Sequence, residues 1–118
     1  MRAVAFILCL LSASAPLRAE DWKMMPGDQL LAQRDLTQRV SGQSLVFYDQ
    51  GQSDFGLDGS YNYTYGAGGD NRGRYIVGTD STICITYDTG ASRCDLYVLN
   101  RSRLVVVTED GMRFPVRS

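Results

Sequence analysis

The chain of 118 residues contains no histidine. Histidine is the usual general base for serine and cysteine nucleophiles and the commonest zinc ligand, so its absence excludes ordinary serine and cysteine hydrolases. The chain also lacks an excess of positive charge, since 12 Lys and Arg stand against 13 Asp and Glu. Affinity for phosphate backbones depends on clustered Lys and Arg, so we expect no binding to nucleic acid.

Long apolar runs are missing as well. The N-terminal run, residues 3–11, has nine residues, whereas a membrane-spanning helix takes roughly 20. Arg2 precedes this run, and a segment of small and polar residues follows it and ends at Ala19. This arrangement predicts a signal peptide over residues 1–19, followed by an N-terminal segment (20–42) and a β domain (43–118). We therefore expect export to the periplasm or the extracellular space, and no membrane span.

Cysteine is scarce, with three residues in the chain. Removal of the signal peptide takes away Cys9 and leaves Cys84 and Cys94, an even pair that is typical of a disulfide in an exported protein. If these two face each other across antiparallel strands, residues 88–90 form a three-residue loop. The last residue of such a loop adopts a left-handed conformation, and Gly90 does so without strain. The spacing therefore predicts a disulfide-closed hairpin.

Short β-type runs, separated by turn residues, fill the chain after Gly42. We predict strands over residues 44–48, 53–57, 60–65, 72–77, 82–87, 93–99, 103–109 and 112–116. Connections this short cannot carry parallel crossovers, so consecutive strands must pair antiparallel. The predicted fold is all-β: an antiparallel meander of about eight short strands that forms a small barrel or a half-open rolled sheet. The continuous apolar run at residues 104–107 predicts a strand covered on both sides or lying near a helix.

The polar segment before the sheet predicts one short helix. Asp28 is a suitable N-cap, Leu36 and Val40 lie four residues apart, and Gly42 is a natural stop. The apolar side of this helix is narrow, so we expect it to cover one end of the β domain rather than form a core of its own.

Three tyrosines alternate along one predicted strand. Alternation places Tyr61, Tyr63 and Tyr65 on one face, where their rings could form an aromatic platform for a sugar or a peptide. The structural alternative is that the rings line or cover the wall of a barrel. Together with Arg72 and Arg74 on the next strand, these tyrosines form the predicted contact surface.

Catalytic and metal-binding patterns are weak. Asp88-Thr89-Gly90 matches the motif of aspartic proteases, in which two such loops share a proton, and a homodimer could supply the second copy. However, Tyr87 stands where that family has an apolar residue, and only residues 91–118 follow the motif. We interpret the motif as a turn and predict no catalytic residue and no cofactor.

Residues 66–71 match one fragment of a calcium-binding repeat, but such sites need stacked copies, so we predict a hairpin loop and no metal.

Turn and core residues also occur in a recognisable order. The order is Gly42-x-Ser44-Leu45, Phe55, Asp58-Gly59-x-Tyr61, Gly73-x-Tyr75-x-Val77, Ile83-Cys84, Arg93-Cys94-Asp95 and Asp110-Gly111-x-Arg113-x-Pro115. It resembles an uncharacterised family of small exported Gram-negative bacterial proteins, a domain of unknown function. The resemblance implies the fold and a periplasmic location, and no activity.

The chain is also similar in size and disulfide-pinned barrel character to periplasmic lysozyme inhibitors. It lacks their Ser-Gly-x-x-Tyr loop and Trp-containing terminal motif, so no inhibitory residues are carried over.

These observations predict a small, exported, non-catalytic binding module of the periplasm or cell envelope. Its partner is expected to be an envelope protein, a glycan or a small ligand. Two alternatives stay open: an aspartic-type hydrolase that uses Asp88 in a homodimer, and a purely structural envelope component. An open apolar cavity at one end of the barrel would favour a small apolar ligand, and a filled interior would favour a protein or glycan surface.

Overall fold

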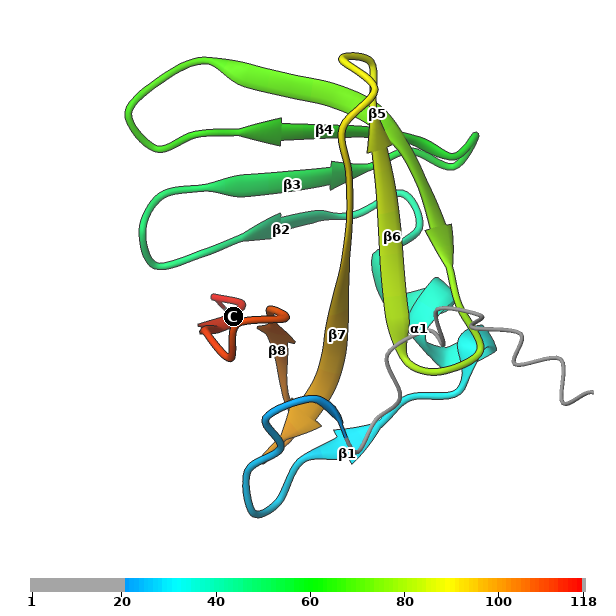
Figure 1. Ribbon diagram of the computed structural model, residues 1–118, viewed down its shortest axis with the longest axis vertical. Helices are drawn as coiled ribbons and strands as arrows, with labels where there is room; N and C mark the ends of the chain where they lie inside the picture. Colours follow the sequence, from blue (N-terminus) through cyan, green and yellow to red (C-terminus); the bar gives the residue numbers. More distant parts are fainter. Residues whose placement is uncertain (1–20, 118) are drawn as a thin grey trace, which may run out of the picture.

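The computed structural model describes residues 21–117. The predicted signal peptide, residues 1–19, lies outside the described residues. The elements, labelled in Figure 1 where there is room, are β1 (Gln29–Leu30), α1 (Gln33–Val40), β2 (Ser44–Val46), β3 (Gln52–Phe55), β4 (Ser60–Thr64), β5 (Asp70–Val77), β6 (Thr82–Tyr87), β7 (Ser92–Asn100), β8 (Arg103–Val107) and β9 (Arg113–Pro115).

The strands form one antiparallel sheet that curls into a half-barrel (Figure 1). Strands β2 to β9 pair in the order of the chain, so the predicted meander of eight short strands after one short helix is confirmed. The two ends of the sheet meet at one point. An isolated bridge joins Phe47 to Val116, and the backbone N–H of Arg117 donates to the carbonyl of Val46 at 2.8 Å. The two-residue strand β1, which the sequence did not predict, pairs with β7.

Gly73 allows the sheet to curl. It pairs with Tyr61 of β4 on one side and with Tyr87 of β6 on the other. A Cβ atom at this position would lie 2.2 Å from the carbonyl oxygen of Thr86, so only glycine permits this backbone approach. A glycine inside a strand often marks a barrel corner. Figure 1 shows β5 bending from the direction of β4 into that of β6.

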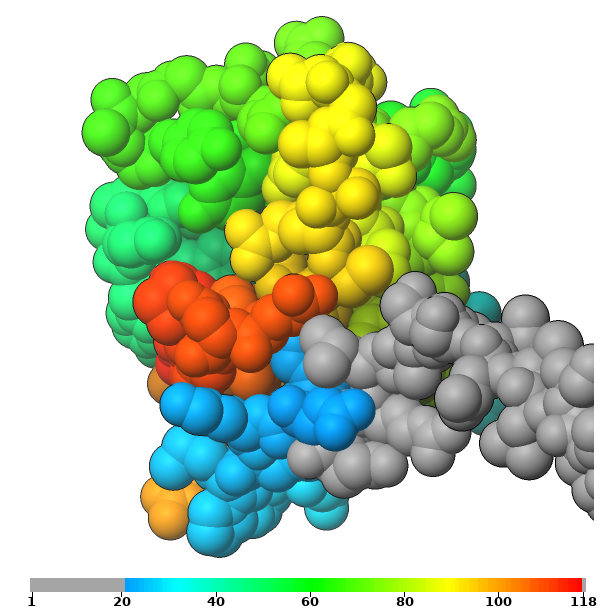
Figure 2. All heavy atoms as spheres, in the orientation of Figure 1, coloured from blue at the N-terminus to red at the C-terminus, as the bar shows by residue number. Residues whose placement is uncertain are grey.

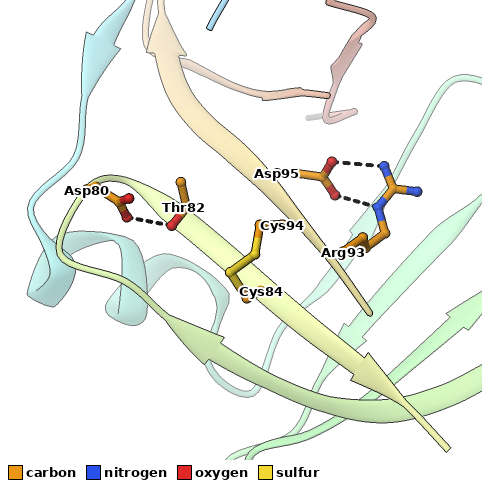
Figure 3. Close-up of a disulfide and its surroundings, with 6 residues drawn as sticks. All are labelled: Asp80, Thr82, Cys84, Arg93, Cys94 and Asp95. Carbon is orange, nitrogen blue, oxygen red and sulfur yellow. Dashed lines mark hydrogen bonds and ion pairs between the residues drawn. A yellow bond between two sulfur atoms is a disulfide. The ribbon is translucent and has the colours of Figure 1, made fainter. Parts of the chain in front are cut away.

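The β6–β7 hairpin has the predicted register and disulfide (Figure 3). Cys84 and Cys94 are directly paired and their sulfur atoms are bonded. The N–H of Tyr87 donates to the carbonyl of Ala91 at 2.8 Å, which leaves a three-residue loop that ends in Gly90 with φ 91°. The N–H of Gly90 also donates to the carbonyl of Tyr87 at 2.9 Å, and the same two turn hydrogen bonds recur in the β2–β3, β3–β4, β4–β5 and β8–β9 hairpins. Such short loops place each strand beside its predecessor.

The predicted start of the helix is wrong. Helix α1 begins at Gln33, and Ala32 occupies the N-cap position without a side-chain hydrogen bond. Asp28 instead has a fully buried side chain that pairs with Arg113 through two contacts of 2.7 and 2.9 Å. It also accepts a hydrogen bond from Asn100 Nδ2 at 2.8 Å. These tertiary partners, which lie far away in the sequence, replace the local capping role.

Helix α1 packs next to β5 and contributes Leu36 and Val40, both fully buried, to the core inside the half-barrel. It has eight residues. Within residues 21–117, no helix has the length and apolar character needed to cross a membrane.

Strand β8 has apolar neighbours on both faces, as its sequence predicts. Leu104 and Val106 belong to the core inside the half-barrel, whereas Val105 and Val107 pack in a second cluster with Trp22 from the N-terminal segment. In Figure 2 the blue N-terminal segment lies against the red and orange C-terminal segments. The N-terminal segment therefore acts as a cover for the outer face of the last strands.

Ser81 links three parts of the chain in the turn before β6. Its Oγ accepts the N–H of Leu31 at 2.8 Å and donates to the carbonyl of Tyr97 at 2.5 Å. The N–H of Tyr97 returns a hydrogen bond to the carbonyl of Ser81 at 2.8 Å. Because Ser81 is 1% exposed, these bonds satisfy polar groups that water cannot reach.

Candidate functional site

The three tyrosines of the predicted stripe all line one cleft on the inner face of the sheet, with a volume of about 210 Å³. Their exposure increases along the chain. Tyr61 is 5% exposed, Tyr63 is half-buried and Tyr65 is 49% exposed. The stripe therefore runs from the core to the mouth of the cleft.

Segments from both halves of the sheet supply the rest of the cleft. The further lining residues are Phe47, Asp49, Ser53, Ile85, Tyr87, Arg93, Asp95, Tyr97, Val106, Thr108 and Phe114. In Figure 2 the surface is hollowed where the green, yellow and red segments meet. The corner at Gly73 brings Tyr61 and Tyr87 together, with ring centroids 6.2 Å apart. The sequence places Tyr87 on the face of Ile85 by alternation, but it does not show that this face turns toward the stripe.

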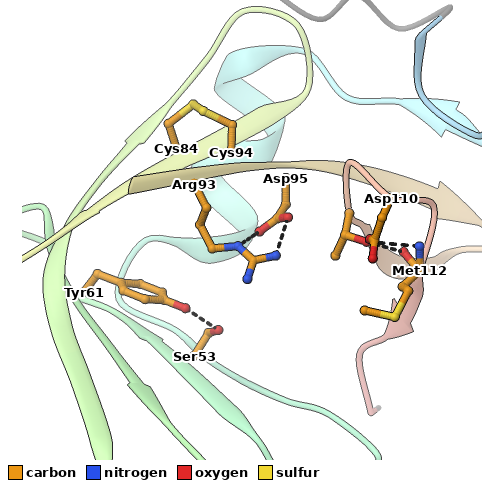
Figure 4. Close-up of polar contacts among 9 residues, drawn as sticks. Ser53, Tyr61, Cys84, Arg93, Cys94, Asp95, Asp110 and Met112 are labelled. Carbon is orange, nitrogen blue, oxygen red and sulfur yellow. Dashed lines mark hydrogen bonds and ion pairs between the residues drawn. A yellow bond between two sulfur atoms is a disulfide. The ribbon is translucent and has the colours of Figure 1, made fainter. Parts of the chain in front are cut away.

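An ion pair lies in the wall of the cleft (Figure 4). Arg93 Nε and Nη2 donate to the two carboxylate oxygens of Asp95 at 2.9 and 2.8 Å. The side chain of Asp95 is 9% exposed and that of Arg93 is 49% exposed. The hydrogen bonds to Asp95 raise the pKa of Arg93 above its ordinary value, so the guanidinium stays charged. Its third nitrogen, Nη1, makes no hydrogen bond with the part of the chain that the structure describes.

Four phenol groups of the cleft stay protonated at physiological pH. Burial raises the pKa of Tyr61, Tyr63, Tyr87 and Tyr97 above the ordinary value of 10.0. The hydroxyl of Tyr61 shares a hydrogen bond of 2.9 Å with Ser53 Oγ (Figure 4). Each uncharged phenol can donate one hydrogen bond and accept others.

The hydroxyls nearer the mouth are unused. Those of Tyr63, Tyr65 and Tyr87 have no hydrogen-bond partner within residues 21–117. The residues that line the cleft therefore combine aromatic rings with hydroxyls that have no partner among the described residues.

The predicted contact surface is divided between two faces of the sheet. Asn62 pairs with Arg72 and Ser60 pairs with Arg74, so both arginines lie on the face opposite the tyrosines. On that outer face Arg74 donates to the backbone carbonyl of Asp58 at 2.7 Å. Arg72 lies 3.6 Å from a carboxylate oxygen of Asp70. Arg93, from β7, is the arginine that the fold places among the tyrosines.

Asp88 lies at the exposed β6–β7 turn and is not among the residues that line the cleft. Its backbone N–H donates to the carbonyl of Arg72 at 2.9 Å, which fixes the turn against β5. Within the described range, no group of three or more His, Cys, Asp and Glu side chains is arranged to hold a metal ion.

Comparisons of the chain with models of protein families, with curated proteins and with solved structures find no significant match. The resemblance to the uncharacterised exported family therefore stays a prediction, and function has to be argued from the cleft.

Proposed function

We propose that this protein is an exported, non-catalytic binding module of the periplasm or cell envelope, and that it holds one ring-sized group of its ligand in the tyrosine-lined cleft. The observation that carries the proposal is the convergence of Tyr63, Tyr65, Tyr87 and Arg93 on one open space, with polar groups that no described residue uses. Pockets of this kind, concave and aromatic with a few convergent polar groups, are the usual form of ligand sites.

The size of the cleft supports a small bound group. Pockets for drug-sized ligands have volumes of roughly 300–1,000 Å³, whereas this cleft has about 210 Å³. The core behind it is filled by Leu36, Val40 and Phe55, which are all at most 2% exposed. A ligand larger than one ring would therefore leave most of its length outside the cleft. The cleft suits a terminal ring or a side group of a longer ligand.

The Cys84–Cys94 disulfide supports export, because disulfides persist in oxidising compartments such as the periplasm. The exposed position of Asp88 on a turn, outside the cleft, favours binding over a hydrolase that uses this residue.

A thermal-shift screen of the oxidised protein against ring-containing small molecules tests the proposal. A compound that binds the folded state at 100 times its Kd stabilises that state by about 2.7 kcal/mol and raises Tm. We expect Tyr65→Leu to abolish the shift, because Tyr65 stands at the mouth of the cleft. Tyr48→Leu is the matched control, since Tyr48 is similarly exposed at 57% but does not line the cleft.

The proposal fails if no compound raises Tm, or if Tyr65→Leu and Tyr48→Leu respond alike. The hydrolase alternative would gain support if the protein cleaved peptides and Asp88→Asn abolished that cleavage. Recovery of the protein only within a crosslinked envelope assembly, with no ligand in the cleft, would favour the structural alternative.

A further inference from the structure

We infer that the group bound in the cleft is an uncharged sugar ring at the end or side of a glycan. The inference rests on the proposed function and names the chemical class of the ligand. A sugar ring has two faces with C–H groups and an edge of hydroxyls, and both of these features have counterparts in the cleft.

The aromatic walls match the faces of such a ring. Tyr63 and Tyr65 pack edge to face, with centroids 4.9 Å apart and an interplanar angle of 80°. At this separation the two rings touch, so a sugar would pack not between them but against the ring surface that they turn to the cleft. Because phenol rings are flat and lose little conformational entropy when they are fixed, they are well suited to pack on the C–H face of a sugar.

The polar groups match the hydroxyl edge. Arg93 Nη1 supplies donors, and the hydroxyls of Tyr63, Tyr65 and Tyr87 supply both donors and acceptors. None of these atoms has a partner within residues 21–117. An alkyl chain or a plain aromatic ring would bury these groups without hydrogen bonds, which is costly. A ring with several hydroxyls would satisfy them.

The charges of the cleft favour a neutral ligand. The charge of Arg93 is balanced by Asp95 at 2.8 Å, and Asp49 adds a further carboxylate to the lining. An anionic group would meet two carboxylates and would compete with Asp95 for the guanidinium. A cationic group would meet the half-exposed guanidinium of Arg93, because the carboxylate of Asp95 is 9% exposed and already paired and that of Asp49 accepts the N–H of Gly51. An uncharged ring avoids both costs.

A glycan array probed with the oxidised protein, together with NMR of protein labelled in its tyrosine rings, tests the inference. We expect binding to glycans with uncharged terminal sugars, and shifts of the ring signals of Tyr63, Tyr65 and Tyr87. The ring signal of Tyr48 should stay unchanged. Arg93→Lys keeps a positive charge beside Asp95 but loses Nη1, and should weaken binding about tenfold, the effect of one hydrogen bond to a charged group.

Arg74→Lys is the matched control for that substitution, because Arg74 lies on the outer face and should leave binding unchanged. Tyr65→Leu, at an exposed position, keeps the test decisive if Arg93→Lys fails to fold. The same NMR sample is titrated with p-cresol, hexanoate and choline. If one of these shifts the cleft tyrosines and no glycan binds, the sugar inference is wrong and the binding function stands. If neither glycans nor these probes shift them, and the thermal-shift screen is also negative, both proposals are wrong.

Discussion

Asp28→Asn should make the protein less stable at neutral pH and should reduce its sensitivity to acid between pH 4 and pH 2. Burial of the Asp28 carboxylate raises its pKa. The hydrogen bonds from Arg113, from Asn100 Nδ2 and from the N–H of Met25 together outweigh this effect and lower the pKa from the ordinary value of 3.8 to about 2. A carboxylate with a lowered pKa in the folded state stabilises that state above its ordinary pKa, and the stabilisation is lost as the pH falls toward the folded value.

The magnitude follows from this lowering. Each pKa unit corresponds to about 1.4 kcal/mol, so a fall from 3.8 to about 2 contributes about 2 kcal/mol at neutral pH. The substitution also leaves Arg113, whose side chain is 21% exposed, without its ion-pair partner. Because breaking a buried pair costs roughly 3–5 kcal/mol, we expect a loss of about 3 kcal/mol at pH 7 that shrinks to about 1 kcal/mol near pH 2.

Equilibrium urea unfolding at a series of pH values measures this effect. Trp22 is the single tryptophan and is 5% exposed, so its fluorescence reports on the N-terminal segment, while far-UV circular dichroism reports on the sheet. Asp35→Asn is the control. Its partner Arg34 lies 3.7 Å away and both side chains are more than half exposed, so the substitution should change stability by less than about 0.5 kcal/mol.

Two results would refute the reasoning. Parallel pH profiles for the original protein and Asp28→Asn would mean that the carboxylate does not titrate differently in the folded state. Equal effects of Asp28→Asn and Asp35→Asn at pH 7 would mean that the pair with Arg113 contributes no more than a surface pair.

Three further predictions concern the sheet and use the same unfolding assay. Gly73→Ala should destabilise far more than Gly90→Ala. The added Cβ meets a backbone atom at 2.2 Å in the first case, whereas at Gly90 the space is open and only the left-handed backbone is penalised, by about 1–2 kcal/mol. Equal losses would show that the corner can relax. Ser81→Ala should cost about 1–3 kcal/mol, because it leaves a buried N–H without its acceptor; a loss near zero would contradict the linking role. Replacing Cys84 and Cys94 by serine should cost up to about 3 kcal/mol, since the disulfide restricts the unfolded chain. An unchanged urea midpoint would contradict this, and the double variant should also be insensitive to reductant.

The sequence by itself determined the strands, their order and the disulfide, because each depends on local rules. Alternation marks the strands, and the turn residues allow loops too short for anything but antiparallel neighbours. The positions of Cys84 and Cys94 on either side of the turn at Gly90 then determine the register of that hairpin.

Only the tertiary structure decided which face became the inside. Alternation separates Tyr63 from Arg72, but it does not say which way the sheet curls, and the corner at Gly73 decides this by bringing β4 and β6 together. For the same reason Arg93, rather than Arg72, joins the tyrosines.

Asp28 is a second residue whose role could not be predicted from the sequence alone. As a local signal it is a helix cap, yet in the folded chain its partner is Arg113, 85 residues away. A buried carboxylate gains more from a bidentate guanidinium than an exposed one gains from a cap, because the low dielectric of the interior strengthens the ion pair. That partner exists only once the sheet has closed, so no local pattern in the sequence reveals it.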